Sequence, residues 1–347
     1  MTAGERTGSD VRRDGLHHVA PGRDALVGSR GGRRGGRGGE VVPPADFRSY
    51  YGRAVVKPPV WKAHNIAGYF FLGGVAGGTA LLAAGADLTG RADMRRAARL
   101  ISAGATGLSL AVLVADLGRP KRFVHMLRVV KPTSPMSIGT WLLSGFAPLV
   151  AVAALDEVSG VLPRRWAELV GYLARPSGLA AVAVAPAVTT YTGTLIADTA
   201  VPVWHDAHRE LPYLFGASAL AAAGGLVTAA SPARESAPAR LAGVAGSLAA
   251  QVVDRAVHRR LGLVAEPLRQ GRPGRLLKAS RWCARAGIAL LATSAVRRSR
   301  TLDVAGGLAL AAESVLTKFA FFYAGAASAA DPRYTVVPQR ERATGTR

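Results

Sequence analysis

The sequence has one cysteine, seven histidines and few aromatic residues among its 347 positions. With Cys283 alone, neither an intrachain disulfide nor a cysteine-ligated metal cluster can form. Acidic residues are also scarce, because 22 Asp and Glu stand against 44 Lys and Arg. No stretch sustains the alternation of apolar and polar residues that is typical of strands. These absences argue against a disulfide-stapled domain, a thiolate-ligated metal centre and a β-sheet protein.

What is abundant points to a membrane. Half of the residues, 49%, are hydrophobic, yet the formal net charge is +22. Soluble domains rarely combine the two, whereas membrane proteins with basic loops do so routinely. The apolar residues are mainly small ones, which let transmembrane helices pack backbone to backbone.

The chain begins with a segment of different composition. Residues 1–57 include the run "GSRGGRRGGRGGE", which is Gly/Arg-rich and cannot bury a core. Arg-Gly repeats also occur in RNA-binding segments, but here no aromatic residues are interleaved. We therefore expect a disordered basic tail beside a lipid bilayer and no nucleic-acid partner. A short polar tail, residues 331–347, is expected at the other end.

Eight apolar segments follow one another between residues 58 and 330. Crossing a bilayer takes about 20 mostly apolar residues in a helix. The pattern predicts an all-α integral membrane protein of eight transmembrane helices with short connections, except for a longer basic connection at 255–281. The sixth segment, which contains Asp254, and the short seventh are the weakest. The predicted helices are 66–87, 97–117, 137–155, 178–200, 211–230, 239–257, 284–296 and 304–327.

The distribution of Lys and Arg predicts the orientation. With eight spans, both termini share a membrane side with the loops that follow the second, fourth and sixth helices. That side carries the larger number of cations, which favours the cytoplasm. We therefore expect a multi-pass protein of the cell membrane with both termini in the cytoplasm.

Polar residues inside or beside apolar helices are costly and are therefore functional candidates. They occur at four places in this chain. The first helix starts with polar residues, the second ends with an acid, the fourth has a polar face, and the eighth contains Glu313 and Lys318. These candidates are His64, Asn65, Tyr69, Asp116, Arg119, Tyr191, Thr194, Asp198 and Glu313.

Topology places most of these candidates together. Odd helices start on the terminal side and even helices end there, so His64, Asp116 and Asp198 share one membrane face. An acid, an imidazole and a phenol can hydrogen-bond the two carbonyls of a quinone head group and exchange its protons. Simpler roles remain open: Asp116 as an ion-pair partner of Arg119, His64 as an interfacial anchor, and Glu313 as the partner of a group on another helix.

Three sequence motifs resemble those of a known family of membrane subunits. The stretches "YFFLGGVAGG", "DLGRPKRFVHML" followed by "KPTSPMSIGTW", and "YTGTLIADTAVPVW" resemble the NrfD / polysulphide-reductase family of membrane subunits. "LPYLFGASALAAAGG" also fits, so the similarity covers roughly residues 58–231. The resemblance implies two four-helix bundles in a subunit that exchanges electrons between the quinone pool and an iron–sulfur partner.

The resemblance also implies a set of ligands and partners. Menaquinone or ubiquinone would bind near the start of the first helix, at His64 or Asn65, and at Tyr191 on the fourth. Members of the family carry neither haem nor iron–sulfur clusters in this subunit. They pair with a multi-cluster, ferredoxin-like iron–sulfur subunit, often with a molybdopterin oxidoreductase subunit beyond it. The chain is thus expected to be a non-haem subunit of an oxidoreductase complex, not a stand-alone enzyme.

Two other classes compete with this reading. A secondary transporter or channel also needs polar helices and proline kinks along a substrate path. A structural anchor that has lost its quinone chemistry would keep the fold alone. Among the candidates, His64, Asp198 and Glu313 are the predicted groups for proton exchange, and no metal ligands are expected.

Overall fold

The computed structural model describes residues 54–116 and 125–343 of the chain. These residues form helices joined by short connections, and the described part contains no strand. They belong to two compact units, residues 60–325 and a smaller unit that includes 54–59 and 326–343. Arg119 and most of the predicted tail at 1–57 lie outside the described residues. The prediction of an all-α protein is confirmed.

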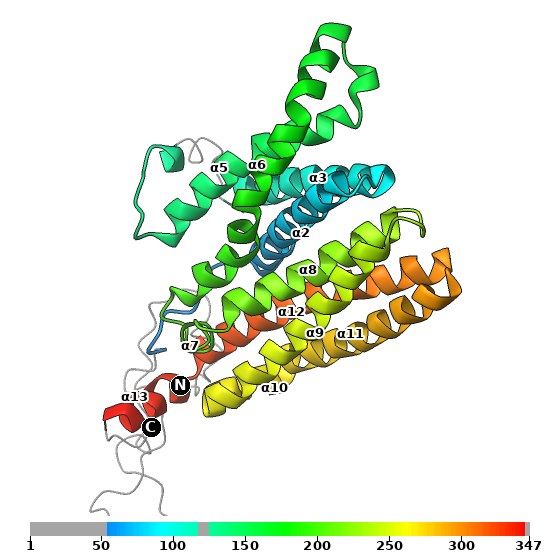
Figure 1. Cartoon of the computed structure of the whole chain (residues 1–347). Coiled ribbons are helices and arrows are strands. Elements are labelled where there is room, and N and C mark those ends of the chain that lie inside the picture. Colours follow the sequence, from blue (N-terminus) through cyan, green and yellow to red (C-terminus); the bar gives the residue numbers. More distant parts are fainter. Residues whose placement is uncertain (1–53, 117–124, 344–347) are drawn as a thin grey trace, which may run out of the picture. The chain divides into compact units, whose positions relative to one another are not determined.

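The first four long helices of the larger unit pack together (Figure 1). Helix α2 lies against both α3 and α6, while α5 lies against α6 and α3. Their apolar residues meet in a shared core that contains Val75, Phe146, Val150 and Val188. The helices are α2 (Ala63–Leu88), α3 (Ala92–Asp116), α5 (Pro135–Asp156) and α6 (Arg164–Ala197).

Three more long helices and residues 300–325 of a fourth lie side by side in the same unit (Figure 1). Helix α8 packs on α9, and α9 on α11. Close approaches of Gly225 to Gly307 and of Gly287 to Leu310 place α12 against α8 and α11. Two short helices, α7 (Pro202–Asp206) and α10 (Glu266–Arg269), lie in the connections. The long ones are α8 (Leu211–Ala230), α9 (Ala237–Leu261), α11 (Gly271–Arg297) and α12 (Arg300–Ala330).

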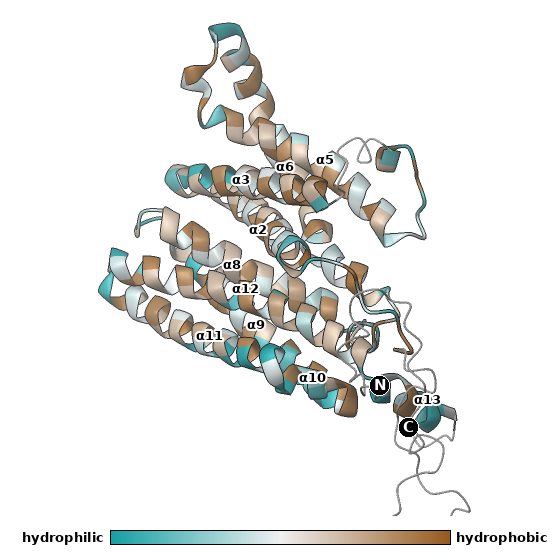
Figure 2. Ribbon diagram, turned by 180° about the vertical axis from the view of Figure 1, so that it is seen from behind, coloured by the Kyte–Doolittle hydropathy of each residue, from teal (hydrophilic) through white to brown (hydrophobic). Residues whose placement is uncertain are grey.

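Hydropathy separates these helices into two kinds. Helices α2, α3, α5, α6, α8 and α12 are long and apolar enough to cross a membrane. Helices α9 and α11 do not meet that criterion, although they are as long. Figure 2 shows the hydrophilic residues that gather on α10 and the adjoining part of α11. The structure therefore supports six spans by composition and leaves the predicted number of eight open.

The prediction of a basic connection over 255–281 is wrong. Helix α9 continues to Leu261, the chain turns at Gly262 with φ of 52°, and α11 begins at Gly271. The reason is that arginines on one face of a helix do not end it when the other face is buried. The buried face of α11 repeats every three or four residues through Leu277, Ser280, Ala284, Gly287 and Leu291. Helix α6 likewise starts at Arg164 and not near residue 178, although Ala174 is the only buried residue in that added part.

Small residues bring α2 to the centre of the larger unit. A Cβ atom on Gly74 or Gly78 would come within 2.8 Å of an alanine Cβ of α8, and one on Gly77 would come 2.7 Å from Thr189 of α6. Only glycine allows both neighbours so close. The glycine-rich run thus aligns α2 between α6 and α8.

Trp204 of α7 anchors the segment that precedes α2. Its ring is fully buried, stacks on Trp61 at a centroid distance of 6.0 Å, and packs on Phe322 of α12. Its Nε1 donates a hydrogen bond of 2.7 Å to the carbonyl oxygen of Phe321. A buried indole with its donor satisfied is a strong anchor. Trp204 therefore ties the segment before α2 to α12.

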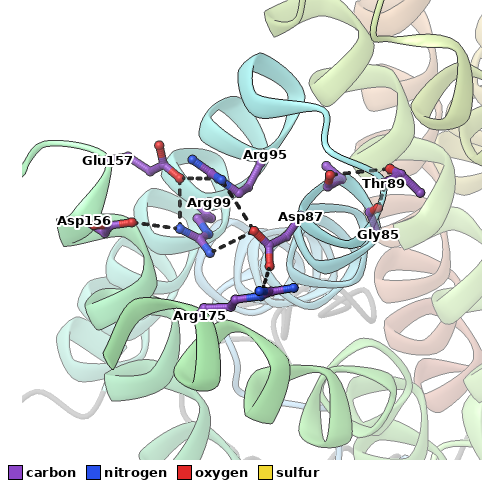
Figure 3. A network of polar contacts seen from close by, with 9 residues as sticks. Gly85, Asp87, Thr89, Arg95, Arg99, Asp156, Glu157 and Arg175 are labelled. Atoms are coloured by element: carbon purple, nitrogen blue, oxygen red, sulfur yellow. Dashed lines mark hydrogen bonds and ion pairs between the residues drawn. The ribbon is translucent and has the colours of Figure 1, made fainter. Parts of the chain in front are cut away.

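An ionic network closes the other end of the first four helices (Figure 3). Arg99 of α3, which is 5% exposed, lies 3.0 Å from Glu157 and 3.3 Å from Asp156, where α5 ends. Its other terminal nitrogen lies 3.9 Å from Asp87 of α2. Arg175 of α6 contacts the second oxygen of Asp87 at 3.2 Å. Charged groups from all four helices thus meet at the end of α2 that lies away from Asn65.

In the smaller unit, the described residues include the end of α12 and helix α13 (Arg333–Ala343). Tyr334 is buried there, and the guanidinium of Arg333 lies over its ring at 4.7 Å. The predicted polar tail at 331–347 thus contains a helix.

Candidate functional site

Four polar side chains from three helices meet in two hydrogen-bonded pairs. Asn65 Nδ2 donates to Asp116 Oδ1 at 2.7 Å, which connects the start of α2 with the end of α3. The hydroxyl of Tyr69 donates to that of Tyr191 at 3.3 Å, which connects α2 with α6. Because Asn65 and Tyr69 are four residues apart, they lie on one face of α2, a turn from each other. We call Asn65, Tyr69, Asp116 and Tyr191 the polar cluster.

Burial differs across the polar cluster. Tyr69 is 3% exposed. Asn65, Asp116 and Tyr191 are partly exposed. The cluster thus has a buried inner end at Tyr69 and three partly exposed side chains.

Two glycines set the rotation of α6 that turns Tyr191 toward α2. A Cβ atom on Gly139 of α5 would lie 2.2 Å from Cζ of the Tyr191 ring, far inside van der Waals contact. A Cβ atom on Gly193 would lie 2.7 Å from the backbone of Leu211. Any larger residue at Gly139 would displace the phenol. The motif "KPTSPMSIGTW" contains this glycine, but its position against the ring could not be read from the sequence.

A mostly apolar groove of about 380 Å³ is lined by α5, by α6 and by the connection that precedes α5. Ile138 lines it and directly precedes Gly139, while Val184 lines it seven residues before Tyr191, on the same face of α6. Lys131 and Trp141 also line the groove. Its size and lining suit an apolar chain attached to a polar group at the cluster.

The other candidates from the fourth helix do not join the cluster. Thr194 and Asp198 are exposed, and so is His64 at the start of α2. Of Tyr191, Thr194 and Asp198, which are expected to line one face of the fourth helix, Tyr191 contacts α2 through its hydroxyl. Arg119 lies outside the described residues. Within the described residues, the contact that Asp116 makes is with Asn65.

Glu313 lies in the other group of helices. It is buried, and its carboxylate accepts a hydrogen bond of 2.6 Å from Ser247 of α9. Five residues on, the buried amine of Lys318 donates to Ser218 at 2.8 Å and to the carbonyl oxygen of Phe215 at 3.0 Å. Sequence reasoning missed Ser218 and Ser247, since serines within apolar helices are common. Glu313 thus belongs to a second polar site, built by α8, α9 and α12.

The cluster has the chemistry to hold a carbonyl compound. Two phenols and an amide can donate hydrogen bonds to carbonyl oxygens, and a carboxylate can accept or return a proton. Among the described residues, no group of three or more His, Cys, Asp or Glu side chains could hold a metal ion.

Comparison with known families gives one match. A family model described as "Polysulphide reductase, NrfD" matches residues 55–249. That range is more than half of the chain and includes the whole polar cluster, Gly139 and the groove. A comparison with curated proteins found no match.

Proposed function

The chain belongs to the polysulphide reductase NrfD family, and we propose that it is the quinone-interacting membrane subunit of an oxidoreductase complex. The proposal is supported by the polar cluster together with the apolar groove, which α5 and α6 line two helical turns from Tyr191. A quinone needs both, because its head group has two carbonyls and its tail is a long apolar chain. Menaquinone and ubiquinone share this architecture, and either fits the proposal.

The proposed roles follow from the contacts. Tyr191 and Asn65, which are partly exposed, donate hydrogen bonds to the head group. Asp116 holds the amide of Asn65, and Tyr69 holds the hydroxyl of Tyr191. Reduction of a quinone takes up two electrons and two protons, and quinol oxidation releases them. The exposed His64 and Asp198 are the proposed groups that pass protons to water.

Electrons need a partner, since none of the cluster side chains is a redox centre. We propose a multi-cluster, ferredoxin-like iron–sulfur subunit, with a molybdopterin oxidoreductase subunit beyond it. Such a subunit would supply the one-electron carriers between the quinone and the catalytic centre. Co-purification in mild detergent tests this: a purified chain that never brings an iron–sulfur protein with it would contradict the partner assignment.

Tyr191→Phe should slow quinone turnover while the protein stays folded. The substitution removes one hydroxyl and keeps the ring against Gly139. A lost hydrogen bond is worth about 0.5–1.5 kcal/mol, so the rate should fall roughly two- to twelve-fold. The measurement is quinol oxidation by the complex in reconstituted membranes.

Tyr172→Phe is the matched control, because Tyr172 lies on the same helix and is 82% exposed. Its rate should equal that of the wild type. Thermal unfolding of both variants separates a loss of turnover from a loss of structure. Equal rates for Tyr191→Phe and wild type would remove Tyr191 from the site.

We also propose that both termini and the iron–sulfur partner lie on the cytoplasmic side of the cell membrane. The larger number of cations on the terminal side supports this. A reporter enzyme fused to the C-terminus should be active only if it is one that works in the cytoplasm. Activity of a reporter that works only outside the cytoplasm would reverse the orientation and the docking side together.

A further inference from the structure

A basic basin opens between α9 and α11, outside the site described above. Its volume is about 370 Å³. Four arginines line it, Arg255 and Arg259 from α9 and Arg281 and Arg285 from α11, together with His258 and Asp254. We call it the arginine basin.

The arginine basin has more positive charge than its own acid can neutralise. Asp254 accepts two hydrogen bonds from Arg281, at 2.7 and 3.1 Å, and its other oxygen lies 3.3 Å from His258 Nδ1. Its charge is thus already balanced. Arg255, Arg259 and Arg285 have no acidic partner among the described residues.

The arginine basin also contains a buried imidazole nitrogen without a hydrogen-bond partner among the described residues. His258 Nδ1 lies 2.8 Å from the carbonyl oxygen of Asp254, which fixes the ring. Its Nε2 is buried and has no hydrogen-bond partner within the described part of the chain. A buried polar atom without a partner is costly. Because Nδ1 donates to a carbonyl oxygen, Nε2 can donate to an oxygen of an anion in the basin only when the ring is an imidazolium.

Beside the basin, the exposed surface of α9 changes from apolar to cationic, which is the pattern of a helix where lipid tails meet head groups. On α9, Leu248 and Val252 are 51% and 61% exposed, and the same stripe continues with the exposed Arg255 and Arg259. These residues are four, three and four positions apart, so they lie on one helix face. The stripe therefore changes from apolar to cationic within one turn.

Helix α11 shows the same boundary. Trp282 is 68% exposed, and the guanidinium of Arg285 lies over its ring at 5.3 Å. Tryptophan is enriched at the level of lipid head groups, where its apolar ring can contact lipid while its N–H contacts water. Trp282 and Arg285 are thus the residue types expected at that level.

We propose that the arginine basin binds the phosphate of an anionic phospholipid, whose acyl chains lie along the exposed apolar stripe of α9. Arginine suits this role, because its planar guanidinium group can donate two hydrogen bonds at once to phosphate oxygens. The site explains why α9 and α11 are charged although they stand among apolar helices. The assignment is independent of the quinone site.

The test uses the full chain purified into nanodiscs, with native mass spectrometry and thermal unfolding as readouts. Phosphatidylglycerol should be retained in preference to phosphatidylcholine and should raise the unfolding temperature. Each arginine near a charged surface contributes a factor of roughly five, so Arg255→Gln with Arg259→Gln should weaken retention roughly 25-fold. Arg285→Gln, on the opposite wall, should weaken it about five-fold.

The matched control is Arg165→Gln with Arg297→Gln, two exposed arginines outside the basin. It removes the same charge and should bind lipid like the wild type. Equal retention by basin and control variants would overturn the site. Saturation by inorganic phosphate at equal concentration would make it a free-phosphate site. Lost partner co-purification with unchanged lipid retention would make it a protein-docking surface.

Discussion

Arg99→Met should lower the free energy of unfolding by about 3 kcal/mol. Removing one partner of a buried ion pair typically costs about 3–5 kcal/mol, because the remaining charge stays buried without compensation. Arg99 is 5% exposed and faces three carboxylates, those of Asp87, Asp156 and Glu157. We place the effect at the lower end because Arg95 and Arg175 still contact Glu157 and Asp87.

Methionine keeps most of the arginine volume, so the change isolates the charge. Arg96→Met, on the same helix at an exposed position, is the control and should change little. Unfolding of both variants would be followed in detergent micelles as the fraction of dodecyl sulfate rises. If Arg99→Met unfolds at the same fraction as Arg96→Met, the network does not hold the four helices together.

Gly225→Ala should separate α8 from α12. The added Cβ would lie 2.4 Å from the carbonyl oxygen of Gly307, a backbone atom that cannot rotate away. On the neighbouring position, Gly224 packs equally closely on Gly243 of α9, so α8 cannot shift to that side. Overpacking costs about 1–3 kcal/mol and occasionally more. We expect Gly225→Ala to lower the free energy of unfolding by an amount at or above the top of that range.

Gly104→Ala provides the comparison, because nothing lies within 4 Å of a Cβ atom at that position on α3. Alanine favours a helix over glycine by about 0.5–1 kcal/mol, so this variant should be as stable as the wild type or slightly more stable. The same unfolding assay measures both. Two alanine variants of equal stability would show that α8 and α12 do not pack as closely as described.

Some of the site could be anticipated from the sequence. The rule that odd helices start and even helices end on one side placed the start of α2 and the end of α3 together, and Asn65 contacts Asp116 there. Which member of "HNIAGY" would face inward was open. His64 is exposed, whereas Asn65 and Tyr69 point toward α3 and α6.

The face of α6 could not be anticipated in the same way. Tyr191 and Thr194 are three residues apart and could share a helix face, yet Thr194 is exposed. The face that α6 turns toward α2 depends on where α6 can approach its neighbours. Gly139 on α5 and Gly193 on α6 settle it, since each allows a contact that a Cβ atom would block.

The sequence by itself determined the class of protein and its helical segments. In lipid, each backbone group must find its hydrogen bond within its own helix, so helix formation is a local property that apolar runs reveal. Helices α9 and α11 are longer than their apolar runs, because burial of one face keeps the chain helical despite its arginines. Only the tertiary structure decided which polar side chains meet, as in the Tyr69–Tyr191 pair, because partners on different helices depend on helix rotation. Contacts between glycines and neighbouring helices set that rotation, and no local pattern records it.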